Sequence, residues 1–151
     1  MGCELAEFLA SPRLVLDSDT EADVNRAADW LRQAERDLGF AKTGAAAGYH
    51  EGAAFYAQQS AEKAVKALIQ SLHGGVRGHS ITEMLRQLPE SISVATDLLN
   101  GAQELDRVYV TSRYPNGFTS GAPADYFNEK SSGELLGYAR AILDWCRSQI
   151  H

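Results

Sequence analysis

The sequence predicts an all-α fold, an antiparallel up-and-down bundle of four to five helices. The first reason is the stretch from Tyr49 to His73, which lacks proline and is rich in the helix formers Ala, Glu, Lys, Gln and Leu. The second is that this stretch and three others carry apolar residues at the spacing of a helix face, whereas no segment alternates as a strand does. The third is that most connections between these segments are short, which favours antiparallel neighbours.

Length and composition are those of a soluble single-domain protein. Over the 151 residues we expect a lead segment, residues 1–22, and one helical domain, residues 23–151. The net charge of −6 argues against general nucleic-acid binding, which depends on neutralising phosphates, although a local basic pocket stays open. No apolar run approaches the roughly 20 residues of a membrane span, and the N-terminus lacks a basic signal-peptide region. We therefore expect a cytoplasmic protein without membrane association.

Neither a metal site nor a cofactor is predicted. Cys3 and Cys146 are the only cysteines and lack metal-ligand spacing. Cys146 falls on an apolar helix stripe, where we expect a buried thiol. No segment matches a phosphate-binding loop or a dinucleotide fingerprint, and no His-Glu-x-x-His occurs.

The first firm helix is expected from about Asp23 to Lys42. Its N-cap candidates are Ser18, Asp19, Thr20 and Asp23. Its apolar stripe consists of Ala27, Leu31, Ala34, Leu38 and Ala41. Gly44 and Gly48 are expected to bracket a short loop before the central helix.

The central helix, Tyr49 to His73, is expected to end at the pair Gly74–Gly75, because glycine is the commonest residue just past a helix. Its apolar stripe consists of Ala54, Ala57, Ala61, Val65, Leu68 and Leu72. Ser80 followed by Glu83 fits a capping box and predicts the start of a short helix that Pro89 stops.

Two further helices complete the predicted bundle. One runs from about Ser93 to Val110 and contains Gly101, which costs about 1 kcal/mol relative to Ala and so suggests close packing. The segment Thr111 to Asp125 then breaks the helical pattern with two prolines and two glycines, and loops of this length are often functional. The last helix is expected to start within residues 128–132 and to end near residue 150.

Candidate functional residues gather in two places. A polar strip lies beside the apolar stripe of the central helix: Gln58, Glu62, Lys63 and Lys66. Local chemistry explains Glu62 and Lys66 as a helix-surface ion pair on a solvated face. Later in the chain, Arg113 could hydrogen-bond the last carbonyls of its helix, Tyr114 is extended because proline follows it, and His79 could shape the turn before Ser80. These local interpretations and functional ones both stay open at this point.

The order of four segments resembles the HEPN domain, named for "higher eukaryotes and prokaryotes nucleotide-binding". The segments are WLRQAERDLGFAK, FYAQQSAEKAVKALI, GHSITEMLRQL and LDRVYVTSRYPNGFTSGAPADYF. The resemblance covers about residues 24–149, and its most specific parts are AxQxAEKAxKA and RYP. It implies an antiparallel bundle, similar to a substrate-binding subunit of a nucleotidyltransferase, that commonly forms a homodimer.

The resemblance also implies partners and activities. Many bacterial HEPN proteins are encoded beside a minimal nucleotidyltransferase. In several such pairs the HEPN protein is a metal-independent ribonuclease toxin and the nucleotidyltransferase is its antitoxin, whereas other members bind nucleotides or are non-catalytic. The ribonuclease signature is Arg, four to six residues, then His, with His moving protons and Arg stabilising charge. Arg113 lies where the family's Arg is expected, but no His follows it before His151.

The leading hypothesis is therefore a non-catalytic HEPN protein that binds a nucleotide such as ATP, a minimal nucleotidyltransferase, or both, as in a toxin–antitoxin-like pair. Arg113 would contact phosphate, because its planar fork donates two parallel hydrogen bonds. The expected ligand-binding residues are Arg113, Tyr114, Lys63, Lys66, Glu62, Gln58 and Asn116. A homodimer is expected from the family and from surplus apolar residues: Phe8, Trp30, Phe118, Tyr126 and Phe127.

Two alternatives stay open. The first is a divergent metal-independent ribonuclease toxin that acts on RNA, with Arg113 and His79 as catalytic residues although they come from different parts of the bundle. The second is a purely structural interaction module that regulates a neighbouring nucleotidyltransferase by contact alone.

Overall fold

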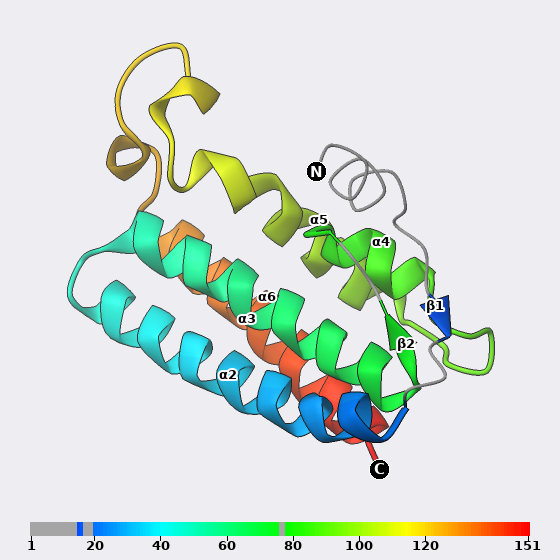
Figure 1. Ribbon diagram of the computed structural model, residues 1–151. Helices are drawn as coiled ribbons and strands as arrows, with labels where there is room; N and C mark the ends of the chain where they lie inside the picture. Colours follow the sequence, from blue (N-terminus) through cyan, green and yellow to red (C-terminus); the bar gives the residue numbers. More distant parts are fainter. Residues whose placement is uncertain (1–14, 17–19, 76–77) are drawn as a thin grey trace, which may run out of the picture.

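The computed structural model describes residues 15–16, 20–75 and 78–151. Within these ranges the α-helices are α2 (Thr20–Ala46), α3 (His50–Ser71), α4 (Ile81–Arg86), α5 (Thr96–Thr111) and α6 (Glu129–Gln149). The four long helices run alternately in opposite directions (Figure 1). The predicted all-α, up-and-down bundle is therefore confirmed.

α2 is longer at both ends than the sequence pattern predicted. It begins at Thr20 rather than near Asp23, and the proposed caps Ser18 and Asp19 lie outside the described residues. The expected loop from Gly44 was wrong, because Gly44 is helical and α2 continues to Ala46. The alanines around this single glycine are strong helix formers, which accounts for the extension. The chain turns only at Gly48, whose φ of 90° is in the left-handed region.

The C-terminus of α3 lies where expected but is built differently. α3 ends at Ser71, and the residue with left-handed backbone is His73, with φ of 63°, rather than a glycine. Gly74–Gly75 instead forms β2, which pairs antiparallel with β1, Val15–Leu16. Strands of two residues are too short to show the alternation by which a strand is recognised in sequence, so this pairing was not predicted.

α4 is held at its N-terminus by two side chains. Ser80 Oγ accepts a hydrogen bond from the Glu83 backbone N–H at 3.2 Å, which is one of the two bonds of the predicted capping box. The carboxylate of Asp106, on α5, accepts hydrogen bonds from the N–H groups of Ile81 at 2.8 Å and Thr82 at 3.0 Å. A helix leaves its first N–H groups unpaired, so Asp106 both caps α4 and fastens it to α5.

α5 and α6 pack closely through a glycine, as predicted. A Cβ atom at Gly101 would lie 3.2 Å from Tyr138 Cβ on α6, tighter than ordinary van der Waals contact. The segment between the two helices contains two short 3₁₀ turns, η1 (Pro115–Gly117) and η2 (Pro123–Asp125). Asn128 then caps α6, because its side chain accepts from the Ser131 N–H at 2.9 Å.

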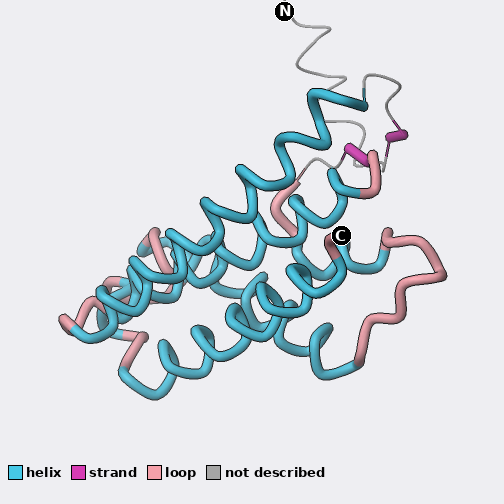
Figure 2. Tube along the Cα trace, turned by 90° about the horizontal axis from the view of Figure 1, so that it is seen from below, coloured by secondary structure: helices cyan, strands magenta, loops and turns pink. Residues whose placement is uncertain are grey.

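α3 is the central helix of the bundle, and it contacts every other helix of the described chain. Figure 2 shows the helices side by side with the loops at their ends. The core residues of α3 are mostly alanines, which permit close approach of α2 and α6. Cys146 is fully buried as expected, and this burial raises the pKa of its thiol well above the ordinary value. No helix of the described ranges is long and apolar enough to cross a membrane.

Candidate functional site

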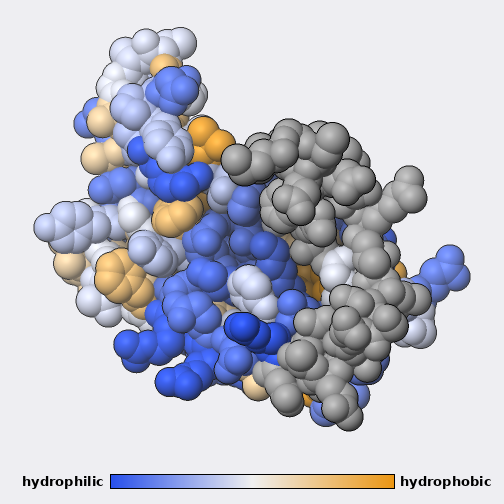
Figure 3. All heavy atoms as spheres, viewed as in Figure 1, coloured by the Kyte–Doolittle hydropathy of each residue, from blue (hydrophilic) through white to orange (hydrophobic). Residues whose placement is uncertain are grey.

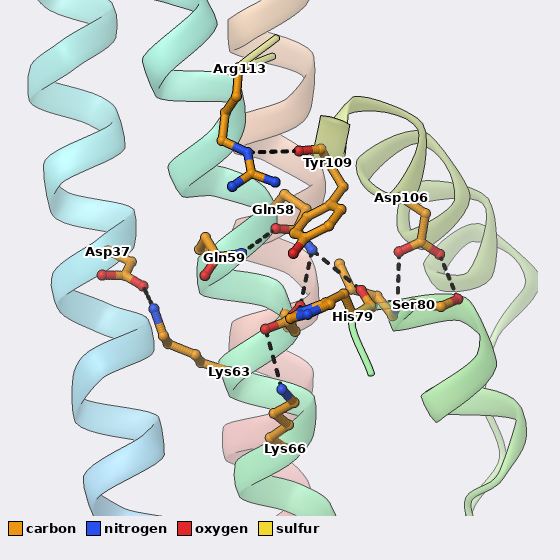
Figure 4. A network of polar contacts seen from close by, with 12 residues as sticks. Asp37, Gln58, Gln59, Lys63, Lys66, His79, Ser80, Asp106, Tyr109 and Arg113 are labelled. Atoms are coloured by element: carbon orange, nitrogen blue, oxygen red, sulfur yellow. Dashed lines mark hydrogen bonds and ion pairs between the residues drawn. The ribbon is translucent and has the colours of Figure 1, made fainter. Parts of the chain in front are cut away.

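The polar strip of α3 is largely buried rather than solvated. Gln58 is 0 % exposed and Glu62 is 4 % exposed. The Glu62 carboxylate accepts hydrogen bonds from His79 Nδ1 at 2.9 Å, from Lys66 Nζ at 3.4 Å and from Gln58 Nε2 at 3.4 Å. The solvated-face interpretation therefore fails for Gln58 and Glu62, and the strip forms a connected network (Figure 4).

His79 is fixed in orientation although its side chain is 57 % exposed. An ionised carboxylate only accepts hydrogen bonds, so the hydrogen of the Glu62 contact lies on His79 Nδ1. The imidazole ring also stacks on Tyr109 of α5, with 4.8 Å between ring centroids and 19° between planes. The second nitrogen, Nε2, is thereby left as an acceptor when the ring is neutral.

Arg113, just past the end of α5, is held by aromatic rings. Its Nε donates to the Tyr109 backbone carbonyl at 3.1 Å, which agrees with the predicted contact to the last carbonyls of the helix. Its guanidinium carbon lies 4.5 Å from the ring centroid of Phe55, 4.7 Å from that of Tyr109 and 4.9 Å from that of Tyr114. No carboxylate of the described residues forms an ion pair with Arg113.

Tyr109 joins the two groups into one cluster. Its ring contacts both the imidazole of His79 and the guanidinium of Arg113, and Figure 4 shows the ring between these two side chains. Hydrophilic residues gather at the centre of this face, over α3 and its junction with α5 (Figure 3). The cluster combines a cation without a described acidic partner, the exposed ring of Tyr114, two half-buried rings and an oriented imidazole.

The lysines predicted for the site are already neutralised. Lys63 forms an ion pair with Asp37 on α2, and Figure 4 shows it directed toward α2 rather than toward Arg113. Lys66 pairs with Glu62 and lies 5.6 Å from the centroid of the Trp30 ring.

The structure thus brings part of the predicted set together. Gln58, Lys66 and His79 all bond to Glu62, Gln58 also bonds to the His79 carbonyl, and Tyr114 contacts Arg113. Lys63 lies apart on the α2 side. Asn116 is exposed in η1, and among the described residues no hydrogen bond or ion pair joins it to the cluster.

Three members of the cluster were not predicted from the sequence. Tyr109 precedes Arg113 by four residues, a spacing that places both on one side of a helix, so this signal was available. Phe55 of α3 contacts Arg113, and Asp106 of α5 accepts from the first N–H groups of α4 beside His79. Both contacts join separate helices, and no local pattern reveals such contacts. Among the described residues no group of His, Cys, Asp and Glu is arranged to hold a metal ion.

One apolar cavity of about 200 Å³ lies away from this cluster, between α5 and α6. It is lined by Asp97, Leu98, Gly101, Tyr138, Ala141 and Ile142. None of the predicted site residues contributes to it.

Comparison with known proteins places the chain in a family. The model of the HEPN domain family matches residues 27–149. Three solved structures are similar to the chain. TT1696 of Thermus thermophilus is 37 % identical, with 83 % of this chain and 98 % of that chain covered and a TM-score of 0.81.

The second is ST0689, described as an archaeal HEPN homologue, which is 42 % identical over 83 % of this chain and 98 % of that chain, with a TM-score of 0.72. The third is an HEPN domain protein (tm0613) of Thermotoga maritima. It is 29 % identical, with 80 % of this chain and 95 % of that chain covered and a TM-score of 0.66. No curated protein matches the chain. The matched residues include most of α2, all of α3, α5 and α6 and the candidate site, and the chain belongs to the HEPN domain family.

Proposed function

We propose that this HEPN domain protein binds a nucleotide by its phosphate at Arg113 and acts without catalysis of its own. The observation that carries the proposal is that the Arg113 guanidinium is held in position without an acidic partner among the described residues. Its guanidinium is positioned by three rings and one backbone carbonyl, and no acid of the described chain neutralises it. The two terminal nitrogens are therefore able to donate parallel hydrogen bonds to a phosphate.

The neighbouring residues suit the rest of a nucleotide. Tyr114 is 49 % exposed and contacts Arg113, so it offers a ring face on which a base could stack. His79 presents Nε2 on the same cluster and could bond a phosphate or ribose hydroxyl. Gln58 and Glu62 would not touch the ligand in this arrangement, because they are buried; they hold His79 in place.

Calorimetric titration with ATP, GTP and their monophosphates tests this proposal. We expect Arg113→Ala to weaken binding about tenfold or more, since hydrogen bonds to charged groups contribute about 1.5–3 kcal/mol. Arg113→Lys should recover only part of the affinity, because lysine lacks the fork.

The matched control is Arg107→Ala, which removes an exposed arginine of α5 that pairs with Glu104. Thermal unfolding of each variant separates lost binding from lost structure. Equal affinity of the wild type and Arg113→Ala, or absence of heat at millimolar ligand, would contradict the proposal.

Self-association and a nucleotidyltransferase partner belong to the same proposal and rest on what the family implies. Exposed aromatic side chains, among them Tyr49 and Tyr126, supply apolar area for such contacts. Light scattering should give a mass near twice the 16.4 kDa of one chain, and co-expression with the product of an adjacent nucleotidyltransferase gene should yield a complex. A monomeric mass and independent purification would contradict this part, including its toxin–antitoxin-like pairing.

A metal-independent ribonuclease is the second candidate, favoured by the hydrogen bond between His79 and Glu62. With Nδ1 bonded to Glu62 at 2.9 Å, a neutral His79 could accept a proton from a ribose 2′-hydroxyl at Nε2. Arg113, which contacts the same Tyr109 ring as His79, would stabilise the charge that develops on the phosphate.

Incubation with RNA in the presence of a chelator tests this candidate. Cleavage should disappear in both His79→Ala and Arg113→Ala and persist in Arg107→Ala. No cleavage by the wild type, or cleavage that survives both substitutions, would eliminate the ribonuclease.

A further inference from the structure

A continuous series of ring contacts extends beyond the candidate site across three helices. Phe40 on α2 lies 4.6 Å, centroid to centroid, from Tyr56 on α3, and Tyr56 lies 5.3 Å from Phe55. Phe55 then contacts Arg113, which contacts Tyr109, and Tyr109 stacks on His79. We call this series the aromatic ladder; its members are Phe40, Tyr56, Phe55, Arg113, Tyr109 and His79.

The ladder ends on α2 at an exposed ring. The planes of Phe40 and Tyr56 are tilted by 59° and those of Phe55 and Tyr56 by 74°, so neither pair lies parallel and face to face. Phe40 is 60 % exposed. Elsewhere in the chain Phe118 and Tyr126 lie parallel at 6° and 3.8 Å, and each therefore covers a face of the other.

The charge around the α2 end favours an anion in spite of the acidic composition. Asp37 and Glu35 of α2 are already paired, with Lys63 and Arg147 respectively. Arg36 precedes Phe40 by four residues, which places both on one side of the helix. It is exposed and forms no ion pair with any residue of the described ranges.

We propose that the aromatic ladder binds the unpaired bases of a single-stranded nucleic acid, with Phe40 and Tyr56 forming a base-stacking subsite beyond the phosphate site at Arg113. Several rings beside exposed or unpaired cations suit single strands, because every unpaired base has a π-face and every linkage a phosphate. A mononucleotide carries one base and occupies one ring, whereas the ladder crosses α2, α3 and α5. A duplex is disfavoured because its bases are already stacked on one another. The inference rests on the proposed function, since Arg113 lies within the ladder.

Fluorescence anisotropy with a labelled single-stranded oligonucleotide of about 12 nucleotides, within the length range of single-strand sites, tests the inference with the full chain. A duplex of the same length and ATP are the comparison ligands. We expect the single strand to bind more tightly than either. Phe40→Leu, which keeps apolar bulk but removes the ring, should weaken the single strand about tenfold and leave ATP binding unchanged. Phe40→Tyr should retain affinity for the strand.

Controls separate this inference from the proposed function. Tyr126→Leu removes an exposed ring that stacks on Phe118 outside the ladder and should change neither affinity. Arg113→Ala should weaken both the single strand and ATP; if it leaves ATP unchanged, the proposed function fails. If Phe40→Leu binds the strand like the wild type, or weakens ATP equally, the base-stacking subsite is overturned while the phosphate site stands.

The oligomeric mass of each variant shows whether a second copy of the chain, rather than a nucleic acid, covers Phe40. If Phe40→Leu lowers the mass of the protein by light scattering together with its affinity for the strand, Phe40 belongs to a contact between two copies of the chain, and the subsite is overturned. An unchanged mass with reduced affinity supports the ladder as the binding surface.

Discussion

Two sets of buried residues on α3 contrast. Ala57, Ala61 and Leu68 are fully buried and apolar, and they stabilise the bundle through close packing and removal of apolar surface from water. Gln58 and Glu62 are buried almost as deeply, yet each is polar and bonded to other polar groups. Burying a carboxylate costs free energy that hydrogen bonds and paired charges only offset.

The contrast teaches where to look for function in this helix. The apolar set stabilises the fold, and this packing role is enough to explain why these residues are buried. The polar set contributes less to stability than apolar residues of equal size could, but it fixes the position of His79 on the surface. An arrangement that sacrifices stability to orient an exposed side chain is typical of a binding site, where the first contacts must be preorganised.

Truncating the apolar set should give the largest loss of stability. Leu68→Ala removes a fully buried side chain, and we expect the free energy of unfolding to fall by about 3 kcal/mol, since such cavities cost about 2–5 kcal/mol. Urea denaturation measures the change. The ATP affinity of the folded variant should equal that of the wild type, and a reduced affinity would mean that the two sets are not independent.

Releasing α4 from α5 should have the next largest effect. Asp106→Ala leaves the N–H groups of Ile81 and Thr82 without their acceptor, so we expect a loss of about 2 kcal/mol, the upper part of the range for an N-cap. Because His79 adjoins this turn, ligand affinity should fall as well. Asp106→Asn retains one acceptor oxygen, so its stability and its ligand affinity should lie between those of the wild type and of Asp106→Ala. Unchanged affinity in Asp106→Ala would show that His79 does not depend on α4.

Neutralising the buried Glu62 carboxylate should lower stability moderately and release His79 from its fixed orientation. Glu62→Gln removes the charge that receives His79 Nδ1 and Lys66 Nζ, and we expect a loss of about 1.5 kcal/mol, the lower value for hydrogen bonds to charged groups. The imidazole resonances of His79 should broaden or shift in NMR spectra because the ring loses its anchor. Gln33→Ala, which removes a side chain bonded to Asp37 at 2.9 Å and not to Glu62, is the control and should leave these resonances unchanged.

An exposed ion pair far from the network should matter least. Arg147 pairs with Glu35 of α2, and both side chains are roughly half exposed, so Arg147→Ala should lower stability by about 0.5 kcal/mol or less. Thermal unfolding at low and high salt measures this effect. A loss comparable to that of Glu62→Gln would contradict the distinction between exposed and buried charge.

The helices were predictable because periodicity and capping are local signals. The α3 stripe, the Ser80 cap and the tight contact at Gly101 are all found where the sequence placed them. The errors were local too: Gly44 was given more weight than the alanines around it, and His73 takes the left-handed conformation expected of a glycine.

The candidate site was only half predictable, because its contacts join distant segments. Arg113 and Glu62 could be chosen from the sequence, but the contact of Glu62 with a histidine 17 residues later depends on how the chain before α4 returns to α3. The pairing of Lys63 with Asp37 of α2 is likewise tertiary, and it removes from the site a charge that the sequence assigned to it. The assignment of ligand contacts to all seven residues, Gln58, Glu62, Lys63, Lys66, Arg113, Tyr114 and Asn116, stays a prediction.

Mapping of backbone amide shifts during an ATP titration tests most directly whether the polar side of α3 and the end of α5 form a binding site. The resonances of Glu62, His79, Tyr109 and Arg113 should move together with a single affinity, while those of Ala61 and Leu68 should not. Shifts confined to the cavity between α5 and α6, around Leu98 and Tyr138, or no shifts at millimolar ATP, would contradict the account.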